Sequence, residues 1–378
     1  MTSLTMLEAA AGPVAPPLWR ILTQVGYFGA LALATGYFLT LAFLLPAHAR
    51  GGAADRSVRA LAVPVAAFVA VAGYAQYAAR IARSKLGSTF AESLSPARFG
   101  DYLALPREKG AWISAAAMAT VQLALFALLA VTIVAMVRFG GRAVAVAGFA
   151  VAILAASAPS LTATITTLDA TANRALKLTH ILACVIWLGG VFVLGAAGLR
   201  ARRTGVDGAG AFERMWARFS VWAMAAVVAV TVSGVWLSWV HVGTVGQFVS
   251  TSYGRFLLLK IVLVMLMVAA GAYNVRVLIP GIRRARLAGD DAGFVRLALR
   301  HFPAVVAAEA LAGIAVLLIV PFLSGSARKQ ADGAAAGPFD WNSFGVGALL
   351  VALLVGGCVL AVRTVPDRAT APDGPVAA

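Results

Sequence analysis

The chain has 378 residues, of which 61% are hydrophobic and 12% are charged, and its formal net charge is +16. Soluble globular proteins contain roughly 45–50% apolar and about 25% charged residues, so these values exclude a soluble fold. Lys and Arg lie in short clusters between apolar segments, which is typical of membrane anchors and argues against nucleic-acid binding. The two cysteines, Cys184 and Cys358, lie inside apolar runs and predict neither a disulfide framework nor a zinc site.

Nine apolar runs are long enough to cross a bilayer, whose core of about 30 Å needs about 20 helical residues. In chain order they are 25–45, 60–79, 111–137, 143–158, 175–199, 217–240, 254–279, 302–323 and 344–362. No basic residue precedes Arg20, unlike in a signal peptide, so the first run is expected to be a true span. The sequence therefore predicts an all-α, polytopic integral membrane helical bundle with about nine transmembrane helices.

The distribution of Lys and Arg predicts the orientation of the spans, because cytoplasmic loops carry an excess of positive charge. With the N-terminus outside, 18 of the 31 Lys and Arg residues lie on the inner side, 12 lie on the outer side, and Lys260 lies within a span. An odd number of spans puts the two termini on opposite sides. We therefore expect an outer N-terminus and a cytoplasmic C-terminus.

The runs divide the chain into four regions. Residues 1–24 are an outer N-terminal segment, and 25–170 are a four-helix membrane region with a long outer loop at 80–110. Residues 171–323 are a second four-helix region, and 324–378 hold the ninth helix and a tail whose composition favours disorder. The loop at 80–110 mixes charged and apolar residues and is interpreted as an amphipathic piece lying on the outer surface.

A weak internal similarity suggests a duplication. Residues 109–112 (Lys-Gly-Ala-Trp) open the third span much as 253–256 (Tyr-Gly-Arg-Phe) open the seventh. Because each block has an even number of spans, the two blocks would be parallel. This favours two parallel four-helix repeats followed by one further helix.

Several residues in the second half of the chain carry a family resemblance. They are His180, the run Trp187-Leu188-Gly189-Gly190, Tyr253-Gly254-Arg255, Lys260, Asn274 and Glu309. With them, the stretch from about His180 to Leu323 resembles the copper resistance protein D family (CopD), inner-membrane proteins associated with copper transport and tolerance. The resemblance implies a CopD-like domain at 171–323 and a bacterial plasma membrane location. It also implies copper as the cargo and a periplasmic or extracellular copper-binding protein as a partner.

The chain also departs from that family. Residues 157–168 offer Ser, Thr and a Pro where members often carry a histidine, and 322–330 lack the paired prolines common after the last core span. No Met-rich or His-rich outer tract is present. Copper as the cargo therefore follows from the resemblance and not from a count of ligands.

Candidate metal ligands lie toward the outer ends of the spans. His180 is about 8 Å into its span, and Cys184 lies one turn deeper on the same helix face. Imidazole with thiolate suits Cu(I) or Zn(II), and sulfur favours Cu(I). Met265 falls at about the depth of Cys184 and could add a thioether, and His241 at the end of the sixth span could serve as an entrance. Structural roles are the alternative: a hydrogen-bonded histidine, and packing by Cys184 and Met265.

Two charged residues lie within spans, where charge is costly and indicates function. Lys260 is level with His180, where its charge favours an uncharged, ligand-competent imidazole; snorkelling to the interface is the structural alternative. Glu309 lies roughly 20 Å deep, where a carboxylate is protonated unless a cation pairs with it. We interpret Glu309 as a proton-linked or cation-binding station, with a structural hydrogen bond as the alternative. Trp187 and Gly189-Gly190 are interpreted as helix packing.

The leading hypothesis is a copper-handling transporter that serves copper homeostasis and resistance. Its outer entrance would be at His180 and His241, a soft-ligand step at Cys184 and Met265, and a deeper station at Glu309. One alternative is a b-type haem redox protein in which His180 and His241 hold the haem between helices. Another is an assembly factor that delivers copper through the same ligands. The sequence has no phosphate-binding loop, nucleophile elbow or zinc-protease motif, so we do not expect an enzyme.

Overall fold

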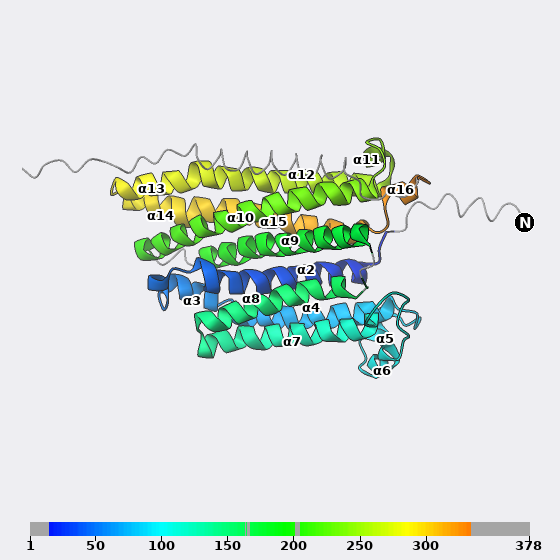
Figure 1. Ribbon diagram of the computed structural model, residues 1–378. Coiled ribbons are helices and arrows are strands. Elements are labelled where there is room, and N and C mark those ends of the chain that lie inside the picture. The colour runs from blue at the N-terminus through cyan, green and yellow to red at the C-terminus, as the bar shows by residue number, and fades with distance from the viewer. Residues whose placement is uncertain (1–14, 163, 165–166, 201–204, 334–378) are drawn as a thin grey trace, which may run out of the picture. The chain divides into compact units, whose positions relative to one another are not determined.

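The computed structural model describes residues 15–162, 164, 167–200 and 205–333 (Figure 1). The chain divides into two units, residues 1–336 and 337–378, and every described residue belongs to the first. This part of the chain forms helices and no extended strand, which confirms the predicted all-α class. The predicted ninth span at 344–362, Cys358 and the C-terminal tail lie outside the described residues.

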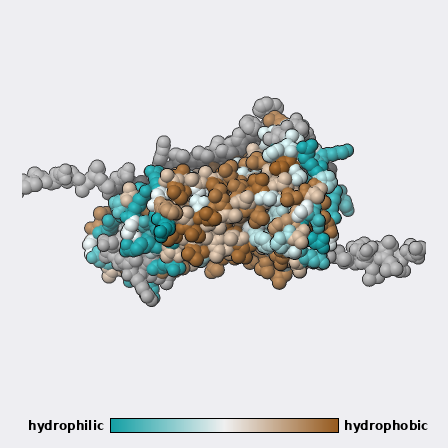
Figure 2. Space-filling view, turned by 90° about the horizontal axis from the view of Figure 1, so that it is seen from below, coloured by the Kyte–Doolittle hydropathy of each residue, from teal (hydrophilic) through white to brown (hydrophobic). Residues whose placement is uncertain are grey.

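Eight helices in the described ranges are long and apolar enough to cross a membrane, and they follow the first eight predicted runs in order. They are Leu18–Leu44, Ala53–Ala82, Ala115–Phe139, Arg142–Leu161, Leu168–Arg200, Gly210–His241, Ser252–Leu287 and Ala304–Phe322. Figure 2 shows hydrophobic side chains across the middle of the helices and hydrophilic ones toward both ends. This pattern fits a bilayer core bounded by two polar interfaces.

The spans are built from long helices joined by short ones. The long helices are α2 (Leu18–Leu39), α4 (Ala62–Ala82), α7 (Ala115–Phe139), α8 (Arg142–Ser157), α9 (Leu168–Arg200), α10 (Gly205–His241), α12 (Ser252–Tyr273) and α15 (Phe302–Ile319). The short α-helices are α3 (Ala53–Arg59), α5 (Phe90–Ser93), α6 (Ala97–Leu103), α11 (Gln247–Ser250), α13 (Ile279–Leu287), α14 (Asp291–Arg296) and α16 (Ala327–Gln330). Three π-helical turns, η1 (Thr40–Leu44), η5 (Asn274–Leu278) and η6 (Leu297–His301), and three 3₁₀ turns, η2 (Ala47–Ala49), η3 (Ala158–Leu161) and η7 (Val320–Phe322), complete the set.

The long helices form two groups that meet along α2 and α9 (Figure 1). In the first group α2 contacts α4 and α8, and α7 closes a ring by contacting the same two helices. In the second group α9 contacts α10 and α15, and α12 contacts α15. Because these groups lie within one compact unit, side chains on α9 can be positioned by helices of either group.

Two glycines allow α2 and α9 to approach closely. A Cβ atom on Gly36 would overlap the carbonyl oxygen of Gly189, and one on Gly189 would overlap the carbonyl oxygen of Ala32. Small residues permit this kind of backbone contact between membrane helices. The packing role predicted for Gly189 is therefore seen, and its partner is a helix of the other group.

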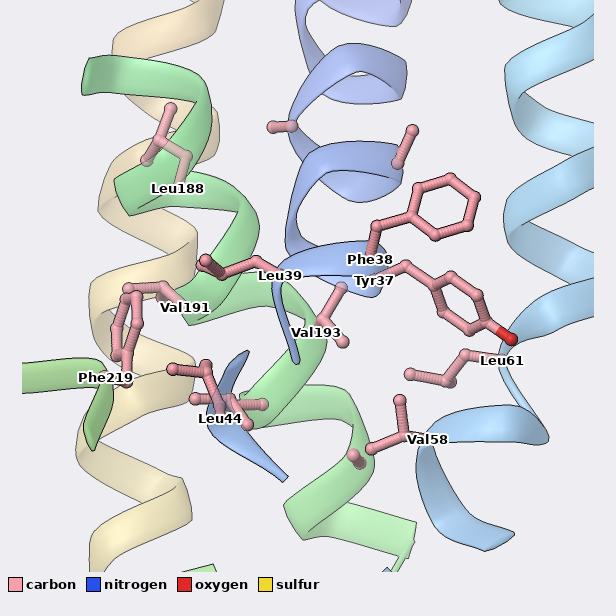
Figure 3. Close-up of a cluster of buried hydrophobic side chains, with 14 of the residues drawn as sticks. Tyr37, Phe38, Leu39, Leu44, Val58, Leu61, Leu188, Val191, Val193 and Phe219 are labelled. Atoms are coloured by element: carbon pink, nitrogen blue, oxygen red, sulfur yellow. The ribbon is translucent and has the colours of Figure 1, made fainter. Parts of the chain in front are cut away.

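Large apolar side chains fill the space around this contact. Tyr37 of α2 lies with Val58 and Leu61 on the side of α3 and α4, whereas Leu188 and Val191 project from α9 (Figure 3). All five side chains are buried. Their burial makes the contact between the two groups part of the main hydrophobic core.

The predicted outer loop at 80–110 folds back onto the helix ends. Phe99 packs edge-on against Tyr77 of α4 with ring centroids 4.8 Å apart, and Tyr102 of α6 is buried in the same cluster. Phe90 of α5 stacks on Trp19 of α2 with centroids 5.1 Å apart. Phe90 and Phe99 of this piece therefore pack on α2 and α4, and its place on a membrane surface stays a prediction.

The similarity between 109–112 and 253–256 does not mark equivalent positions. Residues 109–112 precede the N-cap of α7, Ser114, whereas Tyr253 and Gly254 follow the N-cap of α12, Thr251. The helix neighbours nevertheless agree with a parallel arrangement, because α8 contacts α9 and, correspondingly, α15 contacts α2.

Candidate functional site

Glu309 of α15 lies inside the bundle and is only 5% exposed. Its Oε1 accepts a hydrogen bond from the indole Nε1 of Trp187 in α9, at 3.2 Å. On the side of α12, a Cβ atom on Gly271 would lie 4.0 Å from the same oxygen. The expected burial of Glu309 is therefore confirmed, and within the described residues the carboxyl group forms no ion pair.

Asn274 lies three residues beyond Gly271, on the same face of α12. It is buried, and its Oδ1 has no hydrogen-bond partner among the described residues. The helix changes at Asn274 into the π-helical turn η5, and such turns are frequent at functional sites. A buried carbonyl without a donor is costly, so this oxygen is available to a bound group.

His180 of α9 is half-buried, and its Nδ1 lies 3.0 Å from the hydroxyl oxygen of Ser233 in α10. The buried Ser233 hydroxyl donates to the carbonyl oxygen of Ala229 in its own helix. Since a hydroxyl has one proton, Ser233 then accepts from the Nδ1–H of the imidazole. In this tautomer Nε2 is unprotonated and carries the lone pair that a metal-ligating histidine requires.

Cys184 and Trp187 follow His180 on one face of α9, because residues four and seven positions apart project from the same side of a helix. They lie about 6 and about 10 Å deeper along the helix axis. Cys184 is a half-buried free thiol. Lys260 of α12 is half-buried and close enough for its charge to act on both His180 and Cys184. One face of α9 therefore carries His180, Cys184 and Trp187 in succession, and the last of these contacts Glu309.

His241 does not join this group. It ends α10 eight residues beyond Ser233, which corresponds to about 12 Å along the helix. Its Nδ1 lies 2.7 Å from the carbonyl oxygen of Leu237, and its ring stacks on Tyr253 with centroids 5.8 Å apart. The haem alternative is therefore not supported, because the structure does not bring His180 and His241 to a common position.

Met265 is 60% exposed, whereas Met267, on the opposite side of α12, is 2% exposed. Met265 is therefore not placed to share an ion with Cys184. Within the described ranges, no three His, Cys, Asp or Glu side chains are grouped so that they could hold a metal ion. These residues thus lie apart from one another and do not fit a resident copper centre.

The remaining motif residues serve packing or lie at the surface. Gly190 leaves room for the ring of Phe219 in α10, and a Cβ atom on Gly254 would overlap the backbone of Gln247 in α11. Arg255 is exposed. The glycines of the motif therefore bring α9 and α12 close to their neighbours, as small residues do in membrane bundles.

Two residues of the site are missed by the sequence interpretation. Trp187 is assigned there to packing, but its N–H is the hydrogen-bond partner of Glu309. The spacing of seven from His180 to Trp187 is a signal that could have linked them. Ser233 belongs to no motif, and its position beside His180 depends on how α10 packs against α9.

The fold and the site define a multi-pass membrane protein whose helix bundle encloses separate polar stations. Within it, residues 213–323 match the family model for copper resistance protein D. The match contains Lys260, Asn274 and Glu309 and ends at Leu323, as the resemblance predicts, but it begins in α10 and leaves α9 before it. The chain is thus a multi-pass membrane protein in which residues 213–323 are similar to the copper resistance protein D family. No curated protein and no solved structure matches it.

Proposed function

We propose that this protein moves copper ions across the bacterial plasma membrane and thereby contributes to copper homeostasis and resistance. The observation that carries the proposal is the carboxyl group of Glu309, which is buried among α9, α12 and α15 with an uncharged indole N–H as its partner. A carboxylate in such a place needs a counter-charge, which a proton or an arriving cation supplies. In the family that matches this region, the expected cation is copper.

The outer station is His180. Its unprotonated Nε2 can serve as a neutral nitrogen ligand, and the Cys184 sulfur lies one turn deeper on the same helix face. An ion released from His180 would meet the thiol and then the carboxyl group of Glu309. Each station holds a partly dehydrated ion weakly enough to release it, as permeation requires.

The deeper station combines two oxygens. Glu309 supplies a charged oxygen, and Asn274 supplies a carbonyl oxygen that has no donor among the described residues. Trp187 orients the carboxyl group by its hydrogen bond. In this scheme Glu309 exchanges a proton for the cation, which couples movement of the ion to pH.

The remaining elements of the proposal follow from charge and family. The excess of Lys and Arg on one side places the N-terminus outside and the C-terminus in the cytoplasm. His180 then lies toward the outer surface, where a periplasmic or extracellular copper-binding protein would deliver the ion. The protein acts as a carrier of copper and performs no chemical conversion.

The test compares His180→Ala and Glu309→Gln with wild type at matched expression, by equilibrium copper binding to the purified protein and by copper accumulation in cells. His180→Ala should lose outer binding and accumulation, whereas Glu309→Gln should keep outer binding and lose accumulation or its pH dependence. His48→Ala and Asp291→Asn, both exposed positions, are matched controls. If His180→Ala binds and accumulates copper normally, the outer station is wrong; normal transport by Glu309→Gln across pH makes the carboxyl group structural.

A further inference from the structure

The first helix group contains a buried polar cluster that the copper proposal does not use. Gln122 of α7 is at its centre: its Nε2 donates to the Tyr27 hydroxyl at 2.7 Å and to the carbonyl oxygen of Ala155 at 2.8 Å. Its Oε1 accepts from Nη2 of Arg80 in α4, at 2.7 Å. The Arg80 guanidinium group is thus held by Gln122, whose amide is fixed in turn by the Tyr27 hydroxyl of α2 and a backbone carbonyl oxygen of α8.

A small, partly open cavity adjoins this cluster. Tyr27, Gln76, Tyr77, Arg80 and Gln122 contribute its polar lining. Gln76 is 8% exposed, and its Oε1 has no hydrogen-bond partner among the described residues. Buried polar atoms are normally paired, so this amide oxygen can accept a hydrogen bond from a donor at the cavity.

Arg80 lines this cavity, and two further arginines lie near enough to interact with one another's charge or with that of Arg80. Arg20 of α2 and Arg80 are close enough for their charges to act on Arg83, which follows α4. Within the described residues none of these three arginines forms an ion pair. The Nε of Arg20 is buried and has no acceptor among those residues. The charges of Arg80 and Arg83 also act on the buried Tyr102 of α6.

We propose that this cluster, named here the arginine site (Arg20, Gln76, Arg80, Arg83 and Gln122), binds a group that carries phosphate. The planar guanidinium fork of Arg matches two phosphate oxygens and recognises phosphate better than a point charge does. A hydroxyl of the same ligand would donate to the free Oε1 of Gln76. The ligand is therefore an anion with at least one O–H, such as monoanionic phosphate or a phosphatidylglycerol headgroup.

The position of the arginine site agrees with a phosphate group from either a lipid headgroup or a dissolved molecule. Arg80 lies two residues before the end of α4, and Arg20 lies two residues after the start of α2, so both are at the end of the spans. Headgroup phosphates lie at this level, outside the hydrocarbon core. A free phosphate-bearing solute would reach the same cavity from the aqueous side.

The experiment uses the full-length protein in detergent and two probes. Retention of phosphatidylglycerol against phosphatidylcholine is measured by native mass spectrometry, and inorganic phosphate is titrated by isothermal calorimetry. Wild type should bind one of the two probes, and Arg80→Gln should weaken that binding at least about tenfold, because a hydrogen bond to a charged group is lost. Preference for phosphatidylglycerol identifies the lipid headgroup, and binding of inorganic phosphate identifies a solute.

Two further variants separate recognition from folding and from bulk charge. Lys85→Gln removes one positive charge at an exposed position of the same loop and should bind as wild type does. Arg80→Lys keeps the charge but not the planar fork and should bind between wild type and Arg80→Gln, with an unchanged elution profile. Binding of neither probe, or an equal loss in Lys85→Gln and Arg80→Gln, overturns the proposal. Copper accumulation is measured for the same variants. The arginine-site proposal can then fail while the transport proposal stands, and the reverse result is also distinguishable.

Discussion

Replacing Gly189 with alanine tests whether the contact between α2 and α9 positions the stations on α9. A Cβ atom on Gly189 would overlap the carbonyl oxygen of Ala32 and lie 2.8 Å from the backbone nitrogen of Gly36. Real Cβ atoms essentially never approach within 3.0 Å, so α9 must move away from α2. Because α9 carries both His180 and Trp187, the displacement reaches the outer and the deeper station.

The expected size of the effect of Gly189→Ala follows from the cost of overpacking and from the length of the Trp187–Glu309 hydrogen bond. Overpacking of a well-packed contact costs about 1–3 kcal/mol. The bond from Trp187 Nε1 to Glu309 Oε1 is already 3.2 Å long, and a hydrogen bond at about 3.6 Å no longer counts as one. A shift of about half an ångström would therefore remove it. Losing a bond to a charged group costs about 1.5–3 kcal/mol, which is about 10- to 150-fold in an equilibrium constant.

The assay pairs reversible unfolding in mixed detergent micelles with copper accumulation at matched expression. Gly189→Ala should lower the free energy of unfolding by about 1–3 kcal/mol and reduce accumulation, although no polar group has changed. Gly26→Ala in α2 is the control, because its Cβ would make an ordinary contact of 3.6 Å with the Cβ of Ala72. It should leave the free energy of unfolding within about 0.5 kcal/mol of wild type.

Two results would refute this reasoning in different ways. Wild-type stability of Gly189→Ala would mean that α2 and α9 do not approach this closely in the membrane. Reduced stability with unchanged accumulation would mean that the contact holds the bundle together but does not position Trp187 against Glu309.

Three other predictions concern the deeper station, the outer loop and the topology. Trp187→Phe keeps an aromatic ring but loses the N–H, so accumulation should fall while copper binding at His180 persists; unchanged accumulation would show that Glu309 needs no donor. The backbone N–H of Thr89, and then its hydroxyl, hold the pKa of Glu92 below its ordinary value of 4.5. A lowered folded-state pKa means that the capping box stabilises α5 above pH 4.5 and is lost as the pH falls through that lowered pKa. The hydrogen-exchange protection factors of 84–95 should therefore fall on acidification, and less so in Glu92→Gln; an equal pH dependence of the protection factors in both would contradict this. A reporter fused after Arg363 should be active in the cytoplasm, and outer activity would mean a miscounted span.

The spans could be predicted from the sequence because length and hydropathy decide whether a helix crosses a membrane. The same reasoning predicted the burial of Glu309, since a residue in the middle of an apolar run has no route to either interface. The predicted ends of the spans were less accurate than their order. The fifth span begins at Leu168, several residues before the predicted 175, because polar residues continue the helix beyond the apolar core.

The side-chain partners could not be predicted, because they depend on which helix faces meet. Met265 and Met267 are alike in type and nearly alike in depth, yet Met267 is buried and Met265 is exposed. Met267 is buried because it lies on the face of α12 that packs against α15. A Cβ atom on Gly313 of α15 would lie 3.6 Å from Cε of Met267. Asn274 could be placed on the helix from sequence, but not in a π-helical turn with an unpaired oxygen.

The two helix groups show a correspondence at the level of single residues. Gly36 and Gly189 contact each other across the boundary between the groups. Tyr27 and His180 each precede their glycine by nine residues, so both lie about 14 Å from the contact along α2 and α9. The parallel repeats predicted from the sequence would give this arrangement.

The third helix of each group, α7 or α12, also carries a polar residue at a similar position. The two groups differ in the kind of ion that their polar residues favour. Gln122 lies eight residues after the N-cap of α7, and Lys260 lies nine residues after the N-cap of α12. In the first group Tyr27 and Gln122 hold an arginine, which favours an anion. In the second group His180 has an unprotonated ring nitrogen and the Cys184 thiol follows it on the same face, which favours a soft cation. The two groups thus enclose different polar residues in one chain, as a site for an anion in the first and for a cation in the second would require.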